Sequence, residues 1–132
     1  MVEQVRTGAA PLAPAERIAS FAEFWPYYLS AHKKPLNRAL HYCGTSSAVG
    51  FVAFVALTGH WSWLLAAPVI GYGPAWIGHF LVEGNRPATF GHARYSLMAD
   101  FKMLGLALRG RMSDELDRVL DTDVRREPAP HR

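Results

Sequence analysis

The stretch "ALHYCGTSSAVGFVAFVALTGHWSWLLAAPVIGYGPAWIGHFLV", residues 39–82, contains no Asp, Glu, Lys or Arg. One membrane crossing needs about 20 apolar residues, and this stretch is about twice that long. It predicts a hairpin of two helices at residues 37–57 and 63–82, joined by the glycine and tryptophans of "TGHWSW". We therefore expect an all-α fold: a small helical membrane protein with a central transmembrane hairpin and flanking amphipathic or membrane-spanning helices.

Small residues and prolines suggest how the two helices pack. The segment "GTSSAVG" in the first helix would allow a close approach of the second. The segment "APVIGYGPAW" interrupts the second helix with two prolines and two glycines, which predicts a kink that faces protein. The alternative is a buried hairpin of a soluble protein. It is disfavoured because so short a chain has little else with which to cover the hairpin.

The composition limits the kinds of molecule that the protein is expected to bind. The chain has 132 residues, enough for one domain, and 50% of them are hydrophobic. Its net charge of +3 comes from basic residues that lie beside apolar segments, so we expect contact with the lipid bilayer and its anionic head groups and none with nucleic acid. The single cysteine, Cys43, excludes an internal disulfide and any cysteine-based metal cage.

The charges also suggest domain bounds and orientation. We expect a flexible tail at residues 1–19 without a signal-peptide core, a helical membrane domain at 20–110, and a short soluble helix with a tail at 111–132. Basic residues flank the hairpin on both sides and are missing from its turn: Lys33, Lys34, Arg38, Arg86 and Arg94. Both termini should therefore be cytoplasmic, at the inner membrane of a bacterium or the endoplasmic reticulum of a eukaryote.

Two helices are expected beside the hairpin. The segment "SFAEFWPYYLSAH" starts with capping-box spacing and should lie in the membrane interface. The segment "HARYSLMADFKMLGLALRGR" follows Pro87 and, at helical pitch, places Arg94, Lys102 and Arg109 on a stripe suited to phosphates. Asp100 then points towards the bundle, where an ionisable side chain is costly and indicates a function.

The histidines can be placed by hairpin geometry. Antiparallel packing brings His41 beside His79, with Glu83 one turn further along, whereas His60 at the turn lies roughly 25 to 30 Å away. His32 and His92 can join from the flanking segments. Imidazoles with a carboxylate suit iron, zinc or copper, and a set with vacant positions suits Fe(II) that handles oxygen.

Other interpretations remain open at this point. A lone histidine at a helix end is more often structural than a ligand, and Asn37 with Arg38 could cap a helix or bind phosphate rather than substrate. A haem-binding membrane electron carrier could use His41 and His79 as axial ligands. A non-catalytic membrane scaffold would hold no metal tightly. A membrane di-iron hydroxylase would need more histidines in clustered boxes.

The spacing H-x4-N-R-x2-H in "HKKPLNRALH" and G-H-x3-E-x2-R-P in "GHFLVEGNRP" resembles the Mpo1-like family of small membrane proteins, over residues 21–103. The resemblance implies an Fe(II)-dependent dioxygenase of fatty acid α-oxidation, which uses O2 to convert a 2-hydroxy long-chain fatty acid into a fatty acid one carbon shorter. The histidines of the family fall on His32, His41 and His79, and its acid falls on Glu83.

This resemblance leads to a set of expected roles. We expect His32, His41 and His79 to bind the iron, with His92 as a further candidate ligand and Glu83 as a fourth ligand or a group that orients one. Arg38 or Arg86 would bind the substrate carboxylate, because a guanidinium matches two carboxylate oxygens. Asn37 and Asp100 complete the candidate catalytic set, the acyl tail would lie along the hairpin, and a homo-oligomer is possible.

Overall fold

The computed structural model describes residues 18–126, with side chains to residue 122. Its elements follow in the order α1 (Phe21–Ser30), α2 (Pro35–Thr58), η2 (Trp61–Ala66), α3 (Ala67–Ile77), η3 (Gly78–Glu83), α4 (Thr89–Leu108) and α5 (Met112–Arg126). No strand occurs among the described residues, so the prediction of an all-α fold is confirmed. The expected tails fall mostly on residues 1–17 and 127–132, which lie outside the described residues.

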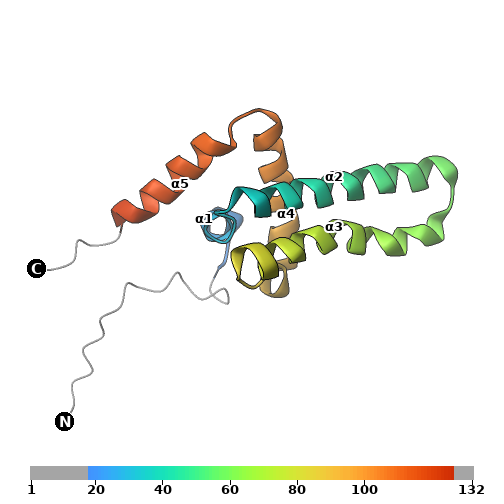
Figure 1. Ribbon diagram of the computed structural model, residues 1–132, viewed down its shortest axis with the longest axis horizontal. Coiled ribbons are helices and arrows are strands. Elements are labelled where there is room, and N and C mark those ends of the chain that lie inside the picture. Colours follow the sequence, from blue (N-terminus) through green and yellow to red (C-terminus); the bar gives the residue numbers. More distant parts are fainter. Residues whose placement is uncertain (1–17, 127–132) are drawn as a thin grey trace, which may run out of the picture.

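The central hairpin has the two limbs that the uncharged stretch predicts (Figure 1). The first limb is α2, which has Pro35 in its first turn and ends before Gly59, whose φ of 74° is the left-handed conformation that glycine adopts freely. The second limb runs from η2 through α3 to η3. Both limbs, Pro35–Thr58 and Trp61–Glu83, are long and apolar enough to cross a membrane.

The second limb changes its winding along its length. It starts as a 3-10 helix, becomes α-helical at Ala67, with Pro68 in the first turn where no N–H partner is needed, and continues through Pro74. It ends as a π-helix over Gly78–Glu83. A π turn is rare and often marks a functional site.

The two limbs pack backbone against backbone at one point. A Cβ atom built on Gly44 of α2 would lie 2.3 Å from the carbonyl oxygen of Gly71 in α3. Only glycine at residue 44 permits this approach, which is how the small-residue segment sets the spacing of the hairpin.

The remaining helices gather at the end of the hairpin away from Gly59. Figure 1 shows α1, α4 and α5 around this base, with α4 running across the hairpin axis. Their shared core is made by residues from α1, α4 and α5: Phe24, Trp25, Tyr28, Leu29, Ala99, Met103, Met112 and Val119. The indole N–H of Trp25 also donates to Glu115 at 2.8 Å and so ties α5 to α1.

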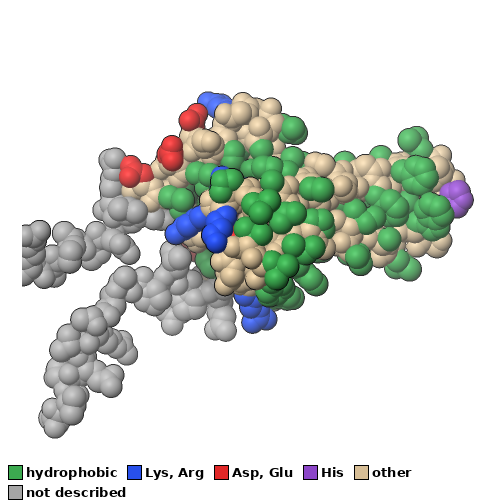
Figure 2. Space-filling view, in the orientation of Figure 1, with side chains coloured by type: hydrophobic (Ala, Val, Ile, Leu, Met, Phe, Trp, Pro, Cys, Tyr) green, Lys and Arg blue, Asp and Glu red, His purple; other side chains and the backbone are tan. Residues whose placement is uncertain are grey.

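The surface divides into an apolar shaft and a charged base. Figure 2 shows hydrophobic side chains covering the hairpin, whereas Lys, Arg, Asp and Glu lie at the opposite end. Only 17% of the apolar window in each limb is buried, whereas the core helices of a soluble protein are mostly buried. Exposed side chains such as Leu57 and Leu65 instead suit a hydrocarbon surrounding, as expected of a membrane protein.

Candidate metal centre

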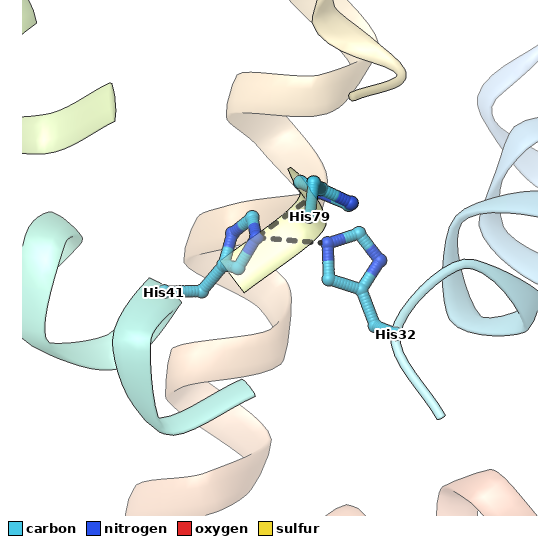
Figure 3. A group of neighbouring side chains, drawn as sticks. All are labelled: His32, His41 and His79. Atoms are coloured by element: carbon cyan, nitrogen blue, oxygen red, sulfur yellow. Dashed lines mark hydrogen bonds between the residues drawn. The ribbon is translucent and has the colours of Figure 1, made fainter. Parts of the chain in front are cut away.

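Three histidines from different segments meet at the base of the hairpin (Figure 3). His32 follows α1, His41 lies in α2, and His79 lies in the π-helix η3. Their exposed fractions are 0%, 4% and 2%. The Nε2 atom of His41 lies 3.1 Å from the Nε2 atoms of both His32 and His79, so three ring nitrogens point into one small space.

The outer nitrogen of each ring has a fixed partner. The Nδ1 atom of His32 contacts the backbone carbonyl of Tyr28, that of His41 contacts Asp100 Oδ1 at 3.0 Å, and that of His79 contacts Asn85 Oδ1 at 2.7 Å. Asn85 is oriented as an acceptor because its Nδ2 donates to the carbonyl of Ala31 at 3.0 Å. All three partners are acceptors, so every Nδ1 carries the proton and donates it.

These outer hydrogen bonds leave each inner nitrogen, Nε2, without a proton and with a free lone pair. A neutral imidazole with a proton on Nδ1 has none on Nε2, so no ring can donate to its neighbour without becoming a cation. Burial opposes that charge, and it lowers the pKa of His32 well below its usual value, helped by the nearby His41. Three unpaired lone pairs therefore converge in a buried space, which is the arrangement that a metal ion satisfies.

All three ligand nitrogens lie within 4.8 Å of one another, and the spacing around His41 suits a single ion. Two ligands at right angles, each bonded at about 2.1 Å, lie about 3 Å apart, which matches the separations of 3.1 Å around His41. Axial haem ligands would instead stand on opposite sides of the iron, about 4 Å apart with the ring between them. The contact between His41 and His79, with His32 as a third member, does not fit a haem.

Asp100 meets the expectation that it points into the bundle. It is 7% exposed, and the same oxygen, Oδ1, accepts from His41 Nδ1 and from the hydroxyl of Tyr28. Burial and the nearby Asp100 carboxylate both raise the pKa of Tyr28 well above its usual value, so the phenol stays a donor. The Tyr28 ring also stacks on His32 with centroids 4.0 Å apart, and so supports two of the three histidines.

The loop between α1 and α2 is held in place by hydrogen bonds to Arg38 and to the end of the second limb. Arg38 donates to the carbonyls of His32 at 2.9 Å and Lys33 at 2.7 Å. Glu83 accepts from the backbone N–H of Lys34, and the Lys34 ammonium donates to the carbonyl of Val82 at 2.8 Å. Glu83 thus joins the end of the second limb to the start of the first.

The other predicted site residues have different surroundings. Asn37 is fully buried, and its Oδ1 atom has no hydrogen-bond partner among the described residues and presses on Gly78, where a Cβ would come within 2.1 Å of it. Arg86 is exposed, with its guanidinium 4.9 Å from the centre of the Phe90 ring. The His92 ring lies 5.7 Å from that of Phe24, and the structure does not bring His92 into the group of three histidines.

Two residues of the site were not singled out from the sequence. Tyr28 is one of several aromatic residues in "SFAEFWPYYLSAH", and Asn85 lies in the loop after the second limb. The sequence offered one signal for Asn85, a polar amide close to His79 at the end of an apolar segment. No comparable signal distinguishes the hydroxyl of Tyr28 from those of Tyr27 or Tyr42.

A comparison with protein families covers the segments that form this site. The family model described as "2-hydroxy-palmitic acid dioxygenase Mpo1-like" matches residues 18–112. The chain belongs to the Mpo1-like family. The matched range contains all three converging histidines together with Tyr28, Asn85 and Asp100. No curated protein and no solved structure matches the chain.

Proposed function

We propose that this member of the Mpo1-like family is an Fe(II)-dependent dioxygenase of fatty acid α-oxidation. It would convert a 2-hydroxy long-chain fatty acid and O2 into a fatty acid one carbon shorter. The observation that carries the proposal is the convergence of three buried Nε2 lone pairs, each fixed by an acceptor on Nδ1. The family description, which names a 2-hydroxy acid dioxygenase, supplies the reaction class.

The donor set suits Fe(II) in such a reaction. His32, His41 and His79 would hold the ion, and three protein ligands leave positions open on an octahedral metal. A 2-hydroxy acid offers its hydroxyl and carboxylate as neighbouring oxygen ligands. Bound Fe(II) would supply the binding and activation of O2, a chemistry that side chains do not provide.

The residues of the chain would orient the histidines and the substrate. Asp100 and Asn85 keep the protons on the outer nitrogens of His41 and His79, so that the inner nitrogens face the ion. We assign the substrate carboxylate to Arg86, which is exposed and directly follows Asn85, whereas Arg38 holds the His32 loop. Unchanged substrate affinity in Arg86→Lys would remove Arg86 from this role.

The membrane explains how an acyl chain would be held. The tail would lie along the apolar hairpin, where burial contributes about 0.8 kcal/mol for each CH2 group. The basic residues at the base favour the cytoplasmic face for both termini. The site would then take its substrate at the cytoplasmic side of the inner membrane or of the endoplasmic reticulum.

The test begins with metal and presumes no substrate. Wild-type protein, His79→Ala and the matched control His60→Ala are purified in detergent without oxygen, supplied with Fe(II) and analysed for bound metal. We expect nearly one iron per chain in the wild type and in the control, and none in His79→Ala. Equal iron in both variants would contradict the metal site. Product masses from 2-hydroxy fatty acids with the iron-loaded protein then test the reaction itself.

A further inference from the structure

Helix α4 presents three distinct faces. One face is buried against the bundle and carries Ser96, Ala99, Asp100 and Met103. A second face carries large apolar side chains that remain exposed: Phe90 at 50%, Leu97 at 48%, Phe101 at 49% and Leu108 at 80%. Leu97, Phe101 and Leu108 recur at helical spacing and form one stripe, which we call the apolar stripe of α4. Phe90 lies before this stripe, on the other side of the kink at His92. The third face carries Lys102 and Arg109, seven residues apart.

The lipid-facing surface of the hairpin reaches the start of α4. The ring of Phe90, just before the kink, lies 5.6 Å from that of Trp76 in α3, and Trp76 stacks on Tyr72 at 6.1 Å. Tryptophan and tyrosine are enriched where a membrane meets water. Phe90 therefore joins the apolar surface of the hairpin to the start of α4, next to the apolar stripe.

Cationic side chains lie along this apolar surface. The Arg86 guanidinium lies over Phe90, and that of Arg94 lies 5.5 Å from the centre of the Tyr95 ring. Long basic side chains can lie along apolar surface and still reach phosphates with their charged ends. A helix with an apolar stripe bordered by Lys and Arg is typical of segments that lie in a membrane interface.

The orientation of α4 agrees with such a position. Figure 1 shows α4 crossing the hairpin axis at its base, so when the hairpin stands upright in a bilayer, α4 lies along the membrane plane. Neither of the two candidate membrane spans among the described residues is α4.

We propose that α4 is an interfacial helix, with its apolar stripe inserted among the acyl chains just below the head groups of the leaflet at the hairpin base. Arg94 and Arg109, both exposed, reach the phosphates of that leaflet. The same helix holds the carboxylate of Asp100 against His41, so the three-histidine group lies within about one helix diameter, roughly 10 Å, of the head groups. A fatty acid then reaches the site from the leaflet, a consequence that rests on the proposed function.

The position of α4 can be measured without metal or substrate. In a Cys43→Ala background, single cysteines at Leu97 and Phe101 are labelled with an environment-sensitive fluorophore, and the protein is placed in lipid nanodiscs. Val49→Cys in the middle of α2 serves as the bilayer control, and Asp117→Cys on α5 as the solvent control. Each label is exposed to aqueous iodide, to lipids with a quencher near the head group, and to lipids with a quencher near the chain end.

We expect the labels at residues 97 and 101 to be quenched severalfold more by the shallow lipid quencher than by the deep one, and hardly by iodide. The label at residue 49 should prefer the deep quencher, and the label at residue 117 should respond to iodide. Iodide quenching at residues 97 and 101 would overturn the proposal by placing the stripe in water. Deep quenching like that at residue 49 would overturn it by placing α4 in the hydrocarbon core. Protection from all three quenchers would overturn it by showing a protein partner, such as a second copy.

Two stripe positions are labelled so that one poorly folded variant does not decide the result. The iron analysis described above is independent of these fluorescence data. Iodide quenching of the stripe would contradict the position of α4 but not the metal site. A protein without iron would contradict the metal site but not the position of α4.

Discussion

The carboxylate of Asp100 in α4 and the imidazole of His41 in α2 meet at 3.0 Å although 59 residues separate them in the chain. Both side chains are buried. The contact holds the proton of His41 on Nδ1 and turns its Nε2 towards His32 and His79. A buried carboxylate that accepts from a histidine in this way is a common support of metal ligands.

Asp100→Asn should weaken the metal site without removing a ligand. The amide has the size of the carboxylate, but it carries no charge and can present an N–H to His41 Nδ1, which favours the wrong tautomer. We expect iron affinity to fall about 10- to 100-fold, measured by competition with a chelator under anaerobic conditions. Asp114→Asn, on the exposed surface of α5, is the control and should bind iron as the wild type does. Undiminished affinity in Asp100→Asn would show that the carboxylate does not support the site.

Tyr28→Phe should lower the stability of the fold strongly and the affinity for metal only slightly. The change removes the hydroxyl that donates to Asp100 but keeps the ring that stacks on His32. A hydrogen bond to a charged group contributes about 1.5 to 3 kcal/mol to stability. We expect a loss of this size in thermal or denaturant unfolding, with a smaller loss of iron affinity than in Asp100→Asn because Asp100 still contacts His41.

The raised pKa of Tyr28 also predicts a dependence on pH. Because burial and Asp100 raise this pKa in the folded protein, the folded state holds the phenolic proton more tightly than the unfolded state does. The resulting stability is fully present below the unfolded pKa of about 10 and is lost as the pH rises above it. The stability difference between wild type and Tyr28→Phe should therefore be constant below this pH and shrink above it. A difference that stays constant in strong alkali would contradict the prediction.

Glu83→Gln distinguishes the ligand role expected for Glu83 from the contact with Lys34 in the structure. In the structure the carboxylate accepts from the N–H of Lys34, a task that the amide oxygen of glutamine can also perform. We expect iron content to remain at the wild-type level and the melting temperature to fall slightly. Loss of iron in this variant, with an unchanged melting temperature, would instead identify Glu83 as a ligand.

Gly44→Ala should separate the two limbs of the hairpin. The added methyl group would lie 2.3 Å from the carbonyl oxygen of Gly71, which is backbone and cannot swing aside. Overpacking of this kind costs about 1 to 3 kcal/mol. Gly50→Ala on the same helix is the matched control, because nothing lies within 4 Å of its added Cβ. The melting temperature in detergent should fall for Gly44→Ala and stay level or rise for Gly50→Ala.

The sequence predicts the long elements well because hydropathy and charge act over many residues. The uncharged stretch marks both limbs, and their antiparallel packing alone brings His41 to His79. The α2 helix begins at Pro35, two residues before the expected start, because proline suits the first turn of a helix.

The remaining features depend on local contacts that a pattern does not contain. Helix α4 begins at Thr89, before the expected helix, and the backbone of His92 leaves the helical conformation, at φ −141° and ψ 61°, so that α4 is kinked near its start. The pairing of Asn85 with His79 depends on the left-handed turn at Gly84. Such features arise from individual hydrogen bonds and turns, so they emerge only when the chain is folded.

The π-helical winding of Gly78–Glu83 makes the length of this segment matter more than its composition. His79 and Asn85 are six residues apart, and the wide turn brings their side chains into contact at 2.7 Å. Removing any one residue between them would favour ordinary α-helical winding and rotate Asn85 about the helix axis by roughly 100°. Natural variants of this protein should therefore tolerate substitutions at residues 80–82 but carry no insertion or deletion there.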